Sequence, residues 1–240
     1  MEVIKRAIIV AAGEGSRLRP VSLTTPKPLV KVNGTRLIDS EINALKKNGI
    51  NEIIIVAGYK KELLHEVYKD DPEILVIDNP YYLRGNNITS IYVARDYLPG
   101  SFVLEGDLMV YNDRILDNRM EKSGYLATWQ HEVPEWELKV IDNTIQSCNI
   151  SGGGRDNYRL WGISMWTEED GARLSELVRR QFEDAGDWSI YWDEIALFKY
   201  SDQFDLGIRE IKIGDIIEID SFKELVALDP SYSSYVQEGK

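Results

Sequence analysis

The stretch VAAGEGSRLRPVSLTTPKPL, residues 10–29, decides the fold that the sequence predicts. It continues an apolar run at residues 6–11, which has the composition of a strand buried on both faces of a parallel sheet. Gly13 and Gly15 then remove two Cβ atoms where the backbone must turn and a ligand must come close. Backbone N–H groups at such a turn are good donors to phosphate oxygens. The stretch therefore predicts a strand that ends in a phosphate-binding loop.

The cations of this stretch extend the prediction to a polyphosphate. Arg17 follows the second glycine, and Lys27 lies between Pro26 and Pro28, whose fixed φ angles stiffen the backbone on either side. The loop lacks the third glycine of the dinucleotide fingerprint and the Gly-Lys-Ser/Thr of a Walker A loop. A surface loop with solvated arginines is the alternative, but the length of the combined pattern favours a nucleotide site.

The charge distribution indicates an enzyme that acts on anionic small molecules. The 240 residues carry a net charge of −12. Residues 1–36 hold seven Lys and Arg against two Glu, a local charge of +5, so that residues 37–240 carry −17. We therefore expect no nucleic acid or membrane partner, and no apolar run approaches the roughly 20 residues of a membrane span. The single cysteine, Cys148, excludes an internal disulfide and favours a reducing cytoplasm. The sequence sets no oligomeric state.

The order of the predicted elements gives the fold class. Apolar, β-branched runs predict strands at 6–11, 52–56, 74–77 and 101–105, and apolar residues at helical spacing predict helices at 37–48, 60–68 and 89–96. Strands that alternate with helices are typical of a doubly wound α/β sheet with right-handed crossovers. We predict an α/β protein with a mixed, mostly parallel sheet flanked by helices and with a smaller antiparallel β region.

The second half of the chain has a different pattern. The predicted strands are at 125–129, 137–141, 144–150, 160–165, 208–212 and 216–219, with a hairpin turn at Asp142-Asn143, and the predicted helices are at 168–184, 189–200 and 221–228. No Pro-rich or Ser-rich linker separates the halves. We predict a single domain over residues 1–240, in which residues 1–107 bind the nucleotide and residues 108–240 bind an acceptor.

Two aspartates are candidates for a metal site. Asp107 and Asp220 each follow an apolar run, so each carboxylate is expected at a strand end near the loop. Mg²⁺ is a hard cation that takes one or two carboxylates together with phosphate oxygens and water. Isolated aspartates at such positions are more often turn or helix-capping residues, and Asp220 does precede a predicted helix. Glu105 and Glu218 lie two residues upstream on the same strand faces and are expected to support the metal or to contact the acceptor.

Further nucleotide contacts are expected at other strand and helix ends. Gly58 and Tyr59 follow the strand at 52–56, at the carboxyl edge where open α/β sheets bind ligands. Asn87 and Ser90 lie at the start of a helix, where capping is an equally good explanation for the asparagine. The predicted nucleotide-binding residues are Ala11, Ala12, Gly13, Gly15, Ser16, Arg17, Lys27, Gly58, Tyr59, Asn87 and Ser90.

The predicted reaction is attack of a phosphate monoester on the α-phosphorus of a nucleoside triphosphate, with release of pyrophosphate. The monoester has a second pKa of about 6, so it is largely a dianion at neutral pH and needs no general base. Catalysis then depends on alignment and charge stabilisation. We predict that Arg17 holds the departing β- and γ-phosphates and that Lys27 faces the charge at the α-phosphorus. Asp107 and Asp220 complete the predicted catalytic set as ligands of Mg²⁺.

The acceptor is suggested by aromatic residues beside acids. These occur as Glu-Trp-Glu at 135–137 and as Trp-Ser-Ile-Tyr-Trp-Asp-Glu at 188–194. Aromatic faces and carboxylates hold a quaternary ammonium, which has no N–H to donate, so the pattern favours choline over a sugar. Tryptophans in the core are an equally good explanation. In a helix Tyr191 and Asp193 point in different directions, so they converge only if they lie in its first turn.

The chain also resembles a known family. The motifs AAGEGSRLRP, TPKPLV, VAGY, NNITSIY, GDLMV, PEWEL, YWDE and EIDS are similar to those of the bacterial CTP:phosphocholine cytidylyltransferases, members of the sugar-phosphate nucleotidyltransferase superfamily, over residues 6–228. The resemblance implies a Rossmann-like nucleotidyltransferase fold, CTP and phosphocholine as substrates, CDP-choline as product and Mg²⁺ on Asp107 and Asp220. It also implies triphosphate contacts from Arg17 and Lys27. The implied choline pocket consists of Trp136, Tyr191 and Asp193, and Glu218 is our fourth candidate for the acceptor side.

Two departures from the family and two alternatives accompany this prediction. Glu105 stands where the family more often has a second aspartate, and residues 151–157 are expected to form an enlarged loop. A sugar-1-phosphate nucleotidyltransferase would share the N-terminal motifs but not the aromatic and acidic clusters. A non-catalytic nucleotide-sensing module would not need both aspartates and Lys27. Only the resemblance selects CTP among the nucleotides.

Overall fold

The computed structural model describes residues 1–236, which form one nine-stranded mixed sheet with flanking helices and small ribbons. The order of the central sheet is β12-β11-β13-β7-β2-β5-β6, with β10 beside β13 and β14 beside β10. The strands are β1 (Glu2–Val3), β2 (Arg6–Ala11), β3 (Lys31–Val32), β4 (Thr35–Arg36), β5 (Glu52–Ala57), β6 (Ile74–Asp78), β7 (Ser101–Glu105), β8 (Leu108–Val110), β9 (Arg119–Met120), β10 (Gly124–Val133), β11 (Glu137–Ile141), β12 (Thr144–Asn149), β13 (Gly154–Trp166), β14 (Gly207–Glu210) and β15 (Ile216–Glu218). The α-helices are α1 (Leu37–Lys47), α2 (Lys61–Tyr68), α3 (Ile88–Ala94), α4 (Glu168–Glu183) and α5 (Phe222–Leu228).

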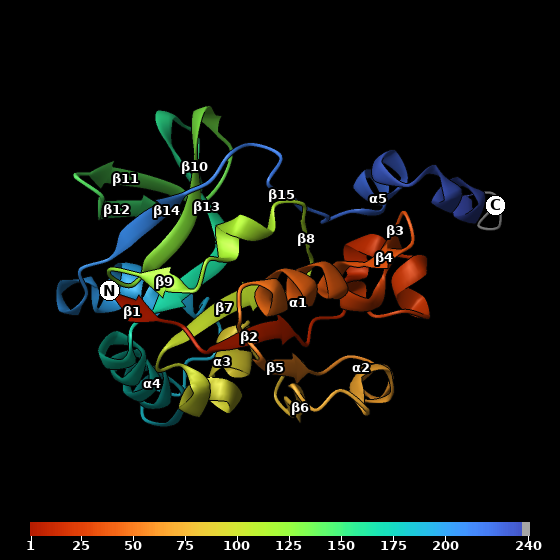
Figure 1. Ribbon diagram of the computed structural model, residues 1–240, viewed down its shortest axis with the longest axis horizontal. Helices are drawn as coiled ribbons and strands as arrows, with labels where there is room; N and C mark the ends of the chain where they lie inside the picture. Colours follow the sequence, from red (N-terminus) through yellow and green to blue (C-terminus); the bar gives the residue numbers. More distant parts are fainter. Residues whose placement is uncertain (237–240) are drawn as a thin grey trace.

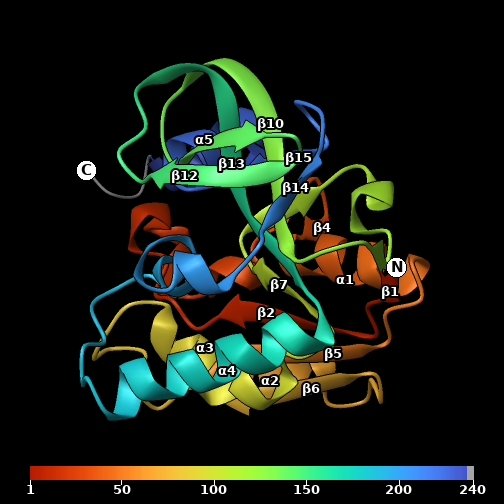
Figure 2. The ribbon, with the colours of Figure 1, turned by 90° about the vertical axis from the view of Figure 1, so that its left-hand side faces the viewer.

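The first half of the chain forms the parallel part of the sheet. β2 lies between β5 and β7 and is parallel to both, with Ile8 opposite Ile54 on one side and Val103 on the other. Ile8 and Ile9 point to opposite faces, and both are buried because helices cover both faces. Ile9 shares a core cluster with residues of α1 and α2, whereas Ile8 packs with α3 and α4. Figure 2 shows α1 on the opposite side of β2 from α3 and α4. The predicted α/β fold class is confirmed.

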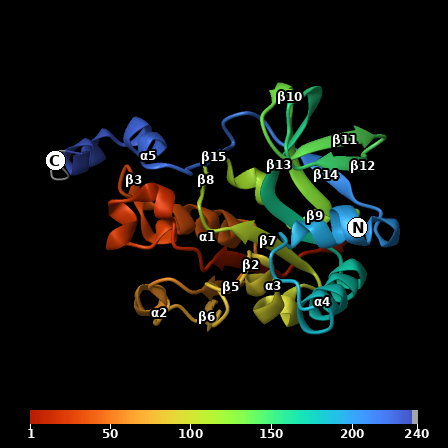
Figure 3. The ribbon, with the colours of Figure 1, turned by 180° about the vertical axis from the view of Figure 1, so that it is seen from behind.

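The second half extends the same sheet with antiparallel strands. β13 pairs with β7 and with the long strand β10, and so connects the two halves through backbone hydrogen bonds. The β11–β12 hairpin turns at Asp142 and Asn143, whose φ angles of +48° and +58° are those of the predicted tight turn. The hairpin lies at one end of the molecule and α5 at the other (Figures 1 and 3). No helix within residues 1–236 has the length and apolar character needed to cross a membrane.

Two of the predicted elements are wrong. The helix expected at 189–200 begins only at Asp193, and residues 195–199 have a π-helical turn. The preceding segment stays non-helical because it bonds to the start of α3: Asn86 N donates to Trp188 O at 2.7 Å, and Trp192 N donates to Asn87 Oδ1 at 3.0 Å. The enlarged loop at 151–157 is shorter than expected, because β13 begins at Gly154, which pairs with Val133 of β10.

Candidate active site

The phosphate loop brings the two ends of the quoted stretch together. It joins β2 to a short 3-10 helix, η1 (Ser16–Leu18), and Gly15 begins this helix with a φ of +58°. A Cβ on Gly15 would lie 2.9 Å from Cβ of Lys27, which starts another 3-10 helix, η3 (Lys27–Leu29). Glycine at this position therefore permits both the left-handed turn and the close approach of the lysine segment.

A pocket over this loop collects most of the predicted nucleotide-binding residues. Its lining includes Ala11, Ala12, Gly13, Gly15, Ser16, Arg17, Lys27, Asn87 and Ser90. Gly58 and Tyr59 lie outside the lining and support the loop from behind. Tyr59 donates from its backbone N to Ala12 O at 3.0 Å and from its hydroxyl to Ser22 O at 3.1 Å. A Cβ on Gly58 would lie 2.7 Å from Ala12 O, so the close packing of the strand end requires glycine there.

Lys27 lies between the two predicted metal ligands. Its Nζ donates to Asp107 Oδ2 at 2.6 Å and to Asp220 Oδ1 at 3.0 Å, and Arg17 Nη2 donates to the same oxygen of Asp220 at 2.9 Å. Burial opposes the charge of Lys27, but the carboxylates of Asp107 and then Asp220 outweigh it and raise the pKa of the ammonium above its usual value. The structure thus brings together the four residues predicted to be catalytic, although they come from distant parts of the sequence.

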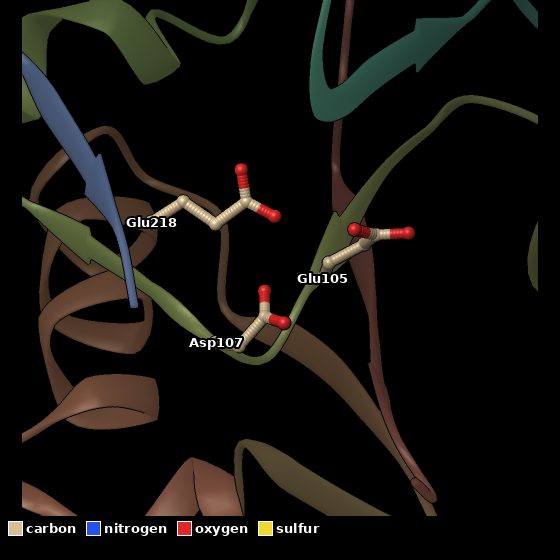
Figure 4. A group of neighbouring side chains, drawn as sticks. All are labelled: Glu105, Asp107 and Glu218. Atoms are coloured by element: carbon tan, nitrogen blue, oxygen red, sulfur yellow. The ribbon is translucent and has the colours of Figure 1, made fainter. Parts of the chain in front are cut away.

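Three carboxylates face one another beside this lysine. Glu105 and Asp107 flank the end of β7 and Glu218 ends β15, and each offers an oxygen within 4.8 Å of the others (Figure 4). Burial, and then the charges of Asp107 and Asp220, raise the pKa of Glu218 to about 7. Burial and the charge of Asp107 raise the pKa of Glu105 well above its usual value. Such crowding is costly unless a cation compensates it.

The acid cluster of Glu105, Asp107 and Glu218 has the donors that a hard cation needs. Asp107 Oδ1 is buried and has no hydrogen-bond partner among the described residues, so it is available as a ligand. Carboxylate oxygens are the preferred protein ligands of Mg²⁺. Asp220 is not part of this group of three, but it shares Lys27 with Asp107. The residues present therefore fit the predicted metal, with Asp107 at the centre of the donor set.

Asn87 connects the pocket over the glycine loop with the acceptor side, by which we mean the segments that carry the predicted acceptor residues Trp136, Tyr191, Asp193 and Glu218. Its Nδ2 donates to Glu105 Oε1 at 3.3 Å, and its Oδ1 accepts from the backbone N of Trp192. Ser90 is 2% exposed, and its hydroxyl accepts from Asn79 Nδ2 at 3.0 Å. Both side chains thus already hold protein partners, and Asn87 places the Tyr191–Trp192 segment next to the pocket.

Two of the four predicted acceptor residues form an aromatic pair, whereas Glu218 lies in the acid cluster and Asp193 is buried outside the pocket lining. The rings of Trp136 and Tyr191 meet edge to face, with centroids 5.5 Å apart, and Tyr191 also lines the nucleotide pocket. Trp136 has a φ of +39°, a region that costs about 1–3 kcal/mol for such a residue unless its neighbours hold it. Asp193 is 8% exposed, and burial raises its pKa to about 7. Trp192 belongs to the core, where it packs against Tyr125 and Trp166.

Arg159 is a residue of the site that the sequence did not predict, and Glu135 was noted only as an acid beside Trp136. Arg159 of β13 donates from Nη2 to Glu218 Oε2 at 2.9 Å and to Glu135 Oε1 at 3.0 Å, and so connects two segments of the acceptor side. The signal available in the sequence was the alternation of a strand, which places Arg159 on the same face as Trp161. That alternation does not reveal which acids the arginine meets.

A glycine loop at the end of a parallel strand, facing carboxylates that can hold a metal, defines a protein that binds nucleoside triphosphates for chemistry at phosphorus. Comparison with known protein families shows which family of such proteins this chain belongs to. The model of the nucleotidyl transferase family matches residues 6–128, and the chain belongs to this family.

Two relatives and one solved structure match nearly the whole chain. The 2-aminoethylphosphonate cytidylyltransferase of Lancefieldella rimae is 34% identical over 229 residues, which cover 94% of this chain and 92% of the relative. The choline-phosphate cytidylyltransferase of Streptococcus pneumoniae is 30% identical over 225 residues, covering 93% and 96%. The solved structure of CTP:phosphocholine cytidylyltransferase from Streptococcus pneumoniae superposes with a TM-score of 0.87 at 29% identity, covering 95% of this chain and 99% of that one. The Rossmann-like nucleotidyltransferase fold predicted above is therefore confirmed.

Proposed function

We propose that the protein transfers CMP from CTP to phosphocholine, giving CDP-choline and pyrophosphate. The observation that carries the proposal is the Trp136–Tyr191 pair beside the pocket that holds Lys27 and Asp107. Aromatic faces stabilise a quaternary ammonium by about 0.5–2 kcal/mol. A phosphocholine whose head lies on this pair would direct its phosphate toward the acid cluster and Lys27. The choline-phosphate cytidylyltransferase relative supports both the acceptor and CTP.

The residues of the pocket have distinct roles in this reaction. An oxygen of the acceptor phosphate forms a bond to the α-phosphorus, and the bond from that phosphorus to the β-phosphate oxygen breaks, so pyrophosphate leaves. The dianionic acceptor needs no proton acceptor. Arg17 holds the departing β- and γ-phosphates, and Lys27 stabilises the charge at the α-phosphorus. The backbone N–H groups of the glycine loop position the triphosphate.

Mg²⁺ is the metal we propose for the acid cluster. Asp107 of the cluster and Asp220 beside it would hold the ion, with Glu105 and Glu218 adjacent, and the ion would supply neutralisation of phosphate charge. Lys27 already forms ion pairs with both aspartates, and so holds their carboxylates close together. Lys27 thus positions both of the proposed metal ligands.

A second candidate acceptor is 2-aminoethylphosphonate, which the Lancefieldella rimae relative favours. Its primary ammonium has three N–H donors that need acceptors, whereas a trimethylammonium has none. The buried carboxylate of Asp193, next to the Tyr191–Trp192 segment, would suit either head group. The aromatic pair favours the trimethylammonium, and for this reason phosphocholine is the first candidate.

The test is pyrophosphate release with Mg²⁺ for each of four nucleoside triphosphates. The acceptors are phosphocholine, phosphoethanolamine, 2-aminoethylphosphonate, glucose-1-phosphate and mannose-1-phosphate. We expect turnover with CTP and phosphocholine, at a kcat/KM at least about tenfold above that of either amine, because the aromatic pair adds about 1.4 kcal/mol. Preference for the phosphonate would select the second candidate. Turnover of a sugar phosphate would place the aromatic pair outside acceptor binding, and no turnover with any pair would favour a nucleotide-sensing protein.

A further inference from the structure

Arg159 is held rigidly at the meeting point of three segments. Its Nη2 donates to Glu218 Oε2 at 2.9 Å and to Glu135 Oε1 at 3.0 Å. The guanidinium carbon lies 4.3 Å from the ring centroid of Trp161, and that ring is fixed by a hydrogen bond of 2.7 Å from its Nε1 to Thr128 Oγ1. A planar guanidinium between a ring and two carboxylates has little freedom to move.

One end of this arrangement is Glu135, which is adjacent to Trp136 in the sequence. Glu135 precedes Trp136, whose φ of +39° lies in a sparsely populated region and persists only where neighbours impose it. The residue after Arg159 adds a second constraint, because Leu160 N donates to Trp136 O at 2.8 Å. On the other side, Trp136 N donates to Ile150 O at 3.2 Å. Two successive residues of β13 therefore hold the segment that carries the tryptophan.

The other end of the arrangement is the acid cluster. Glu218 belongs to this cluster together with Asp107, which pairs with Lys27. The Arg159 bridge therefore runs from Glu135, the residue before Trp136, to Glu218 of the acid cluster, where the proposed function places the reacting phosphate.

We propose that Arg159 is a positioning residue that selects acceptors by the distance between their cationic head and their phosphate. This inference rests on the proposed function, since it takes Trp136 as the site of the head group. With the bridge intact, an acceptor with a two-carbon spacer reaches both places at once, and one with a longer spacer does not. Without the bridge, the Trp136 segment can shift, and the difference between the two acceptors becomes smaller.

The same strand supplies a matched control. Arg155 and Glu132 also form an ion pair between β13 and β10, but at 3.6 Å, with 71% and 74% of the side chains exposed. The side chain of Arg159 is 18% exposed. Exposed ion pairs of this kind contribute little to stability. Arg155→Gln therefore removes one cation from β13 and leaves the bridge intact.

The experiment compares Arg159→Gln and Glu135→Gln with the wild type and with Arg155→Gln. The acceptors are phosphocholine and its homologue with one more methylene between the trimethylammonium and the phosphate. We expect the wild type to prefer phosphocholine by about 10-fold to 200-fold in kcat/KM, the usual effect of one methylene in a fitted pocket. Both bridge variants should lower this ratio at least about fivefold, raise the KM for phosphocholine and leave the KM for CTP unchanged, and Arg155→Gln should match the wild type.

Amide hydrogen exchange of the free protein gives a readout that does not depend on turnover. Peptides that contain Trp136 should exchange faster in both bridge variants and at the wild-type rate in Arg155→Gln. An unchanged acceptor ratio in the bridge variants, or unchanged exchange around Trp136, would overturn the positioning role even if activity falls. A wild type that uses neither acceptor would instead refute the proposed function, and the length selection with it.

Discussion

The nucleotide side and the acceptor side of this site are built in different ways. On the nucleotide side, one stretch of twenty residues supplies the loop, the arginine and the lysine, and the parallel strand β2 places them. On the acceptor side, Trp136, Tyr191, Arg159 and Glu218 come from four separate segments that meet only in the folded chain. In the proposed function, phosphate is therefore recognised mainly by local backbone geometry, whereas the head group requires tertiary packing. A family can therefore keep its nucleotide and change its acceptor.

The largest effect is expected where the two sides meet, at Asp107. Asp107→Asn removes the charge that pairs with Lys27 and weakens the acid cluster as a metal site. We expect kcat to fall by about 10²-fold to 10³-fold, comparable with the loss of one strong transition-state contact. We also expect the dependence of the rate on Mg²⁺ concentration to become shallow. Pyrophosphate release over a range of Mg²⁺ concentrations measures both.

The control for Asp107→Asn is Asp113→Asn, which removes an exposed partner of Lys47. It should leave turnover within about twofold of the wild type, since surface pairs contribute little. Wild-type turnover of Asp107→Asn with an unchanged response to Mg²⁺ would place the reaction centre elsewhere.

The next effect concerns the stability of the acceptor side. Burial raises the folded-state pKa of Asp193 to about 7, so between about pH 4 and about pH 7 the folded protein holds a proton that the unfolded chain has lost. The stability contribution of this group therefore falls as pH rises through that window and is constant above it. Asp193→Asn should abolish this dependence. We expect the stability of the wild type relative to the variant to decrease by about 2–4 kcal/mol from pH 4.5 to pH 8.

Urea unfolding at several pH values measures the effect of Asp193→Asn. Asp184→Asn, which changes a carboxylate that is 66% exposed at the end of α4, is the matched control and should follow the wild type. A constant difference between wild type and Asp193→Asn across this range would mean that the buried carboxyl keeps an ordinary pKa.

A smaller effect is expected from a substitution that changes the binding of the acceptor and not that of the nucleotide. Trp136→Ala removes one ring of the aromatic pair and should raise the KM for phosphocholine by about 3-fold to 30-fold, equivalent to about 0.5–2 kcal/mol of lost cation–π attraction. The KM for CTP should stay the same, because the nucleotide pocket does not include this ring. Trp129→Ala, at a tryptophan of β10 that is 47% exposed, is the control and should change neither constant. Equal effects of Trp136→Ala on both substrates would assign Trp136 to the core.

The same contrast explains how much the sequence could predict. The strands, α1 and the Lys27 loop followed from local signals: β-branched runs, helical spacing and the paired prolines. The wrong secondary-structure predictions were in the second half of the chain, at 151–157 and 189–200, and on the nucleotide side Gly58 and Tyr59 lie outside the pocket lining. Residues 189–192 have helix-compatible spacing, but their backbone groups bond to Asn86 and Asn87 instead. Arg159 lies one residue before the predicted strand at 160–165, and its two carboxylate partners come from other segments of the folded chain, which spacing does not encode.

The smallest effect tests whether the cap of α5 influences the position of Asp220, which lies where the nucleotide side and the acceptor side meet. Ser221 begins α5 with a capping box: Glu224 N donates to Ser221 Oγ at 3.3 Å, and Glu224 Oε2 accepts from the backbone N of Ser221 at 2.8 Å and of Asp220 at 2.9 Å. Ser221→Ala should lower the free energy of unfolding by about 1 kcal/mol. It should also lower kcat about twofold to threefold, because a loosened helix start lets Asp220 move away from Lys27. Thr167→Ala, at the N-cap of α4, should cost similar stability without changing kcat, since no residue of the acid cluster adjoins that helix start. Equal loss of kcat in both variants would show that the effect of Ser221 is one of general stability, and that α5 does not position Asp220.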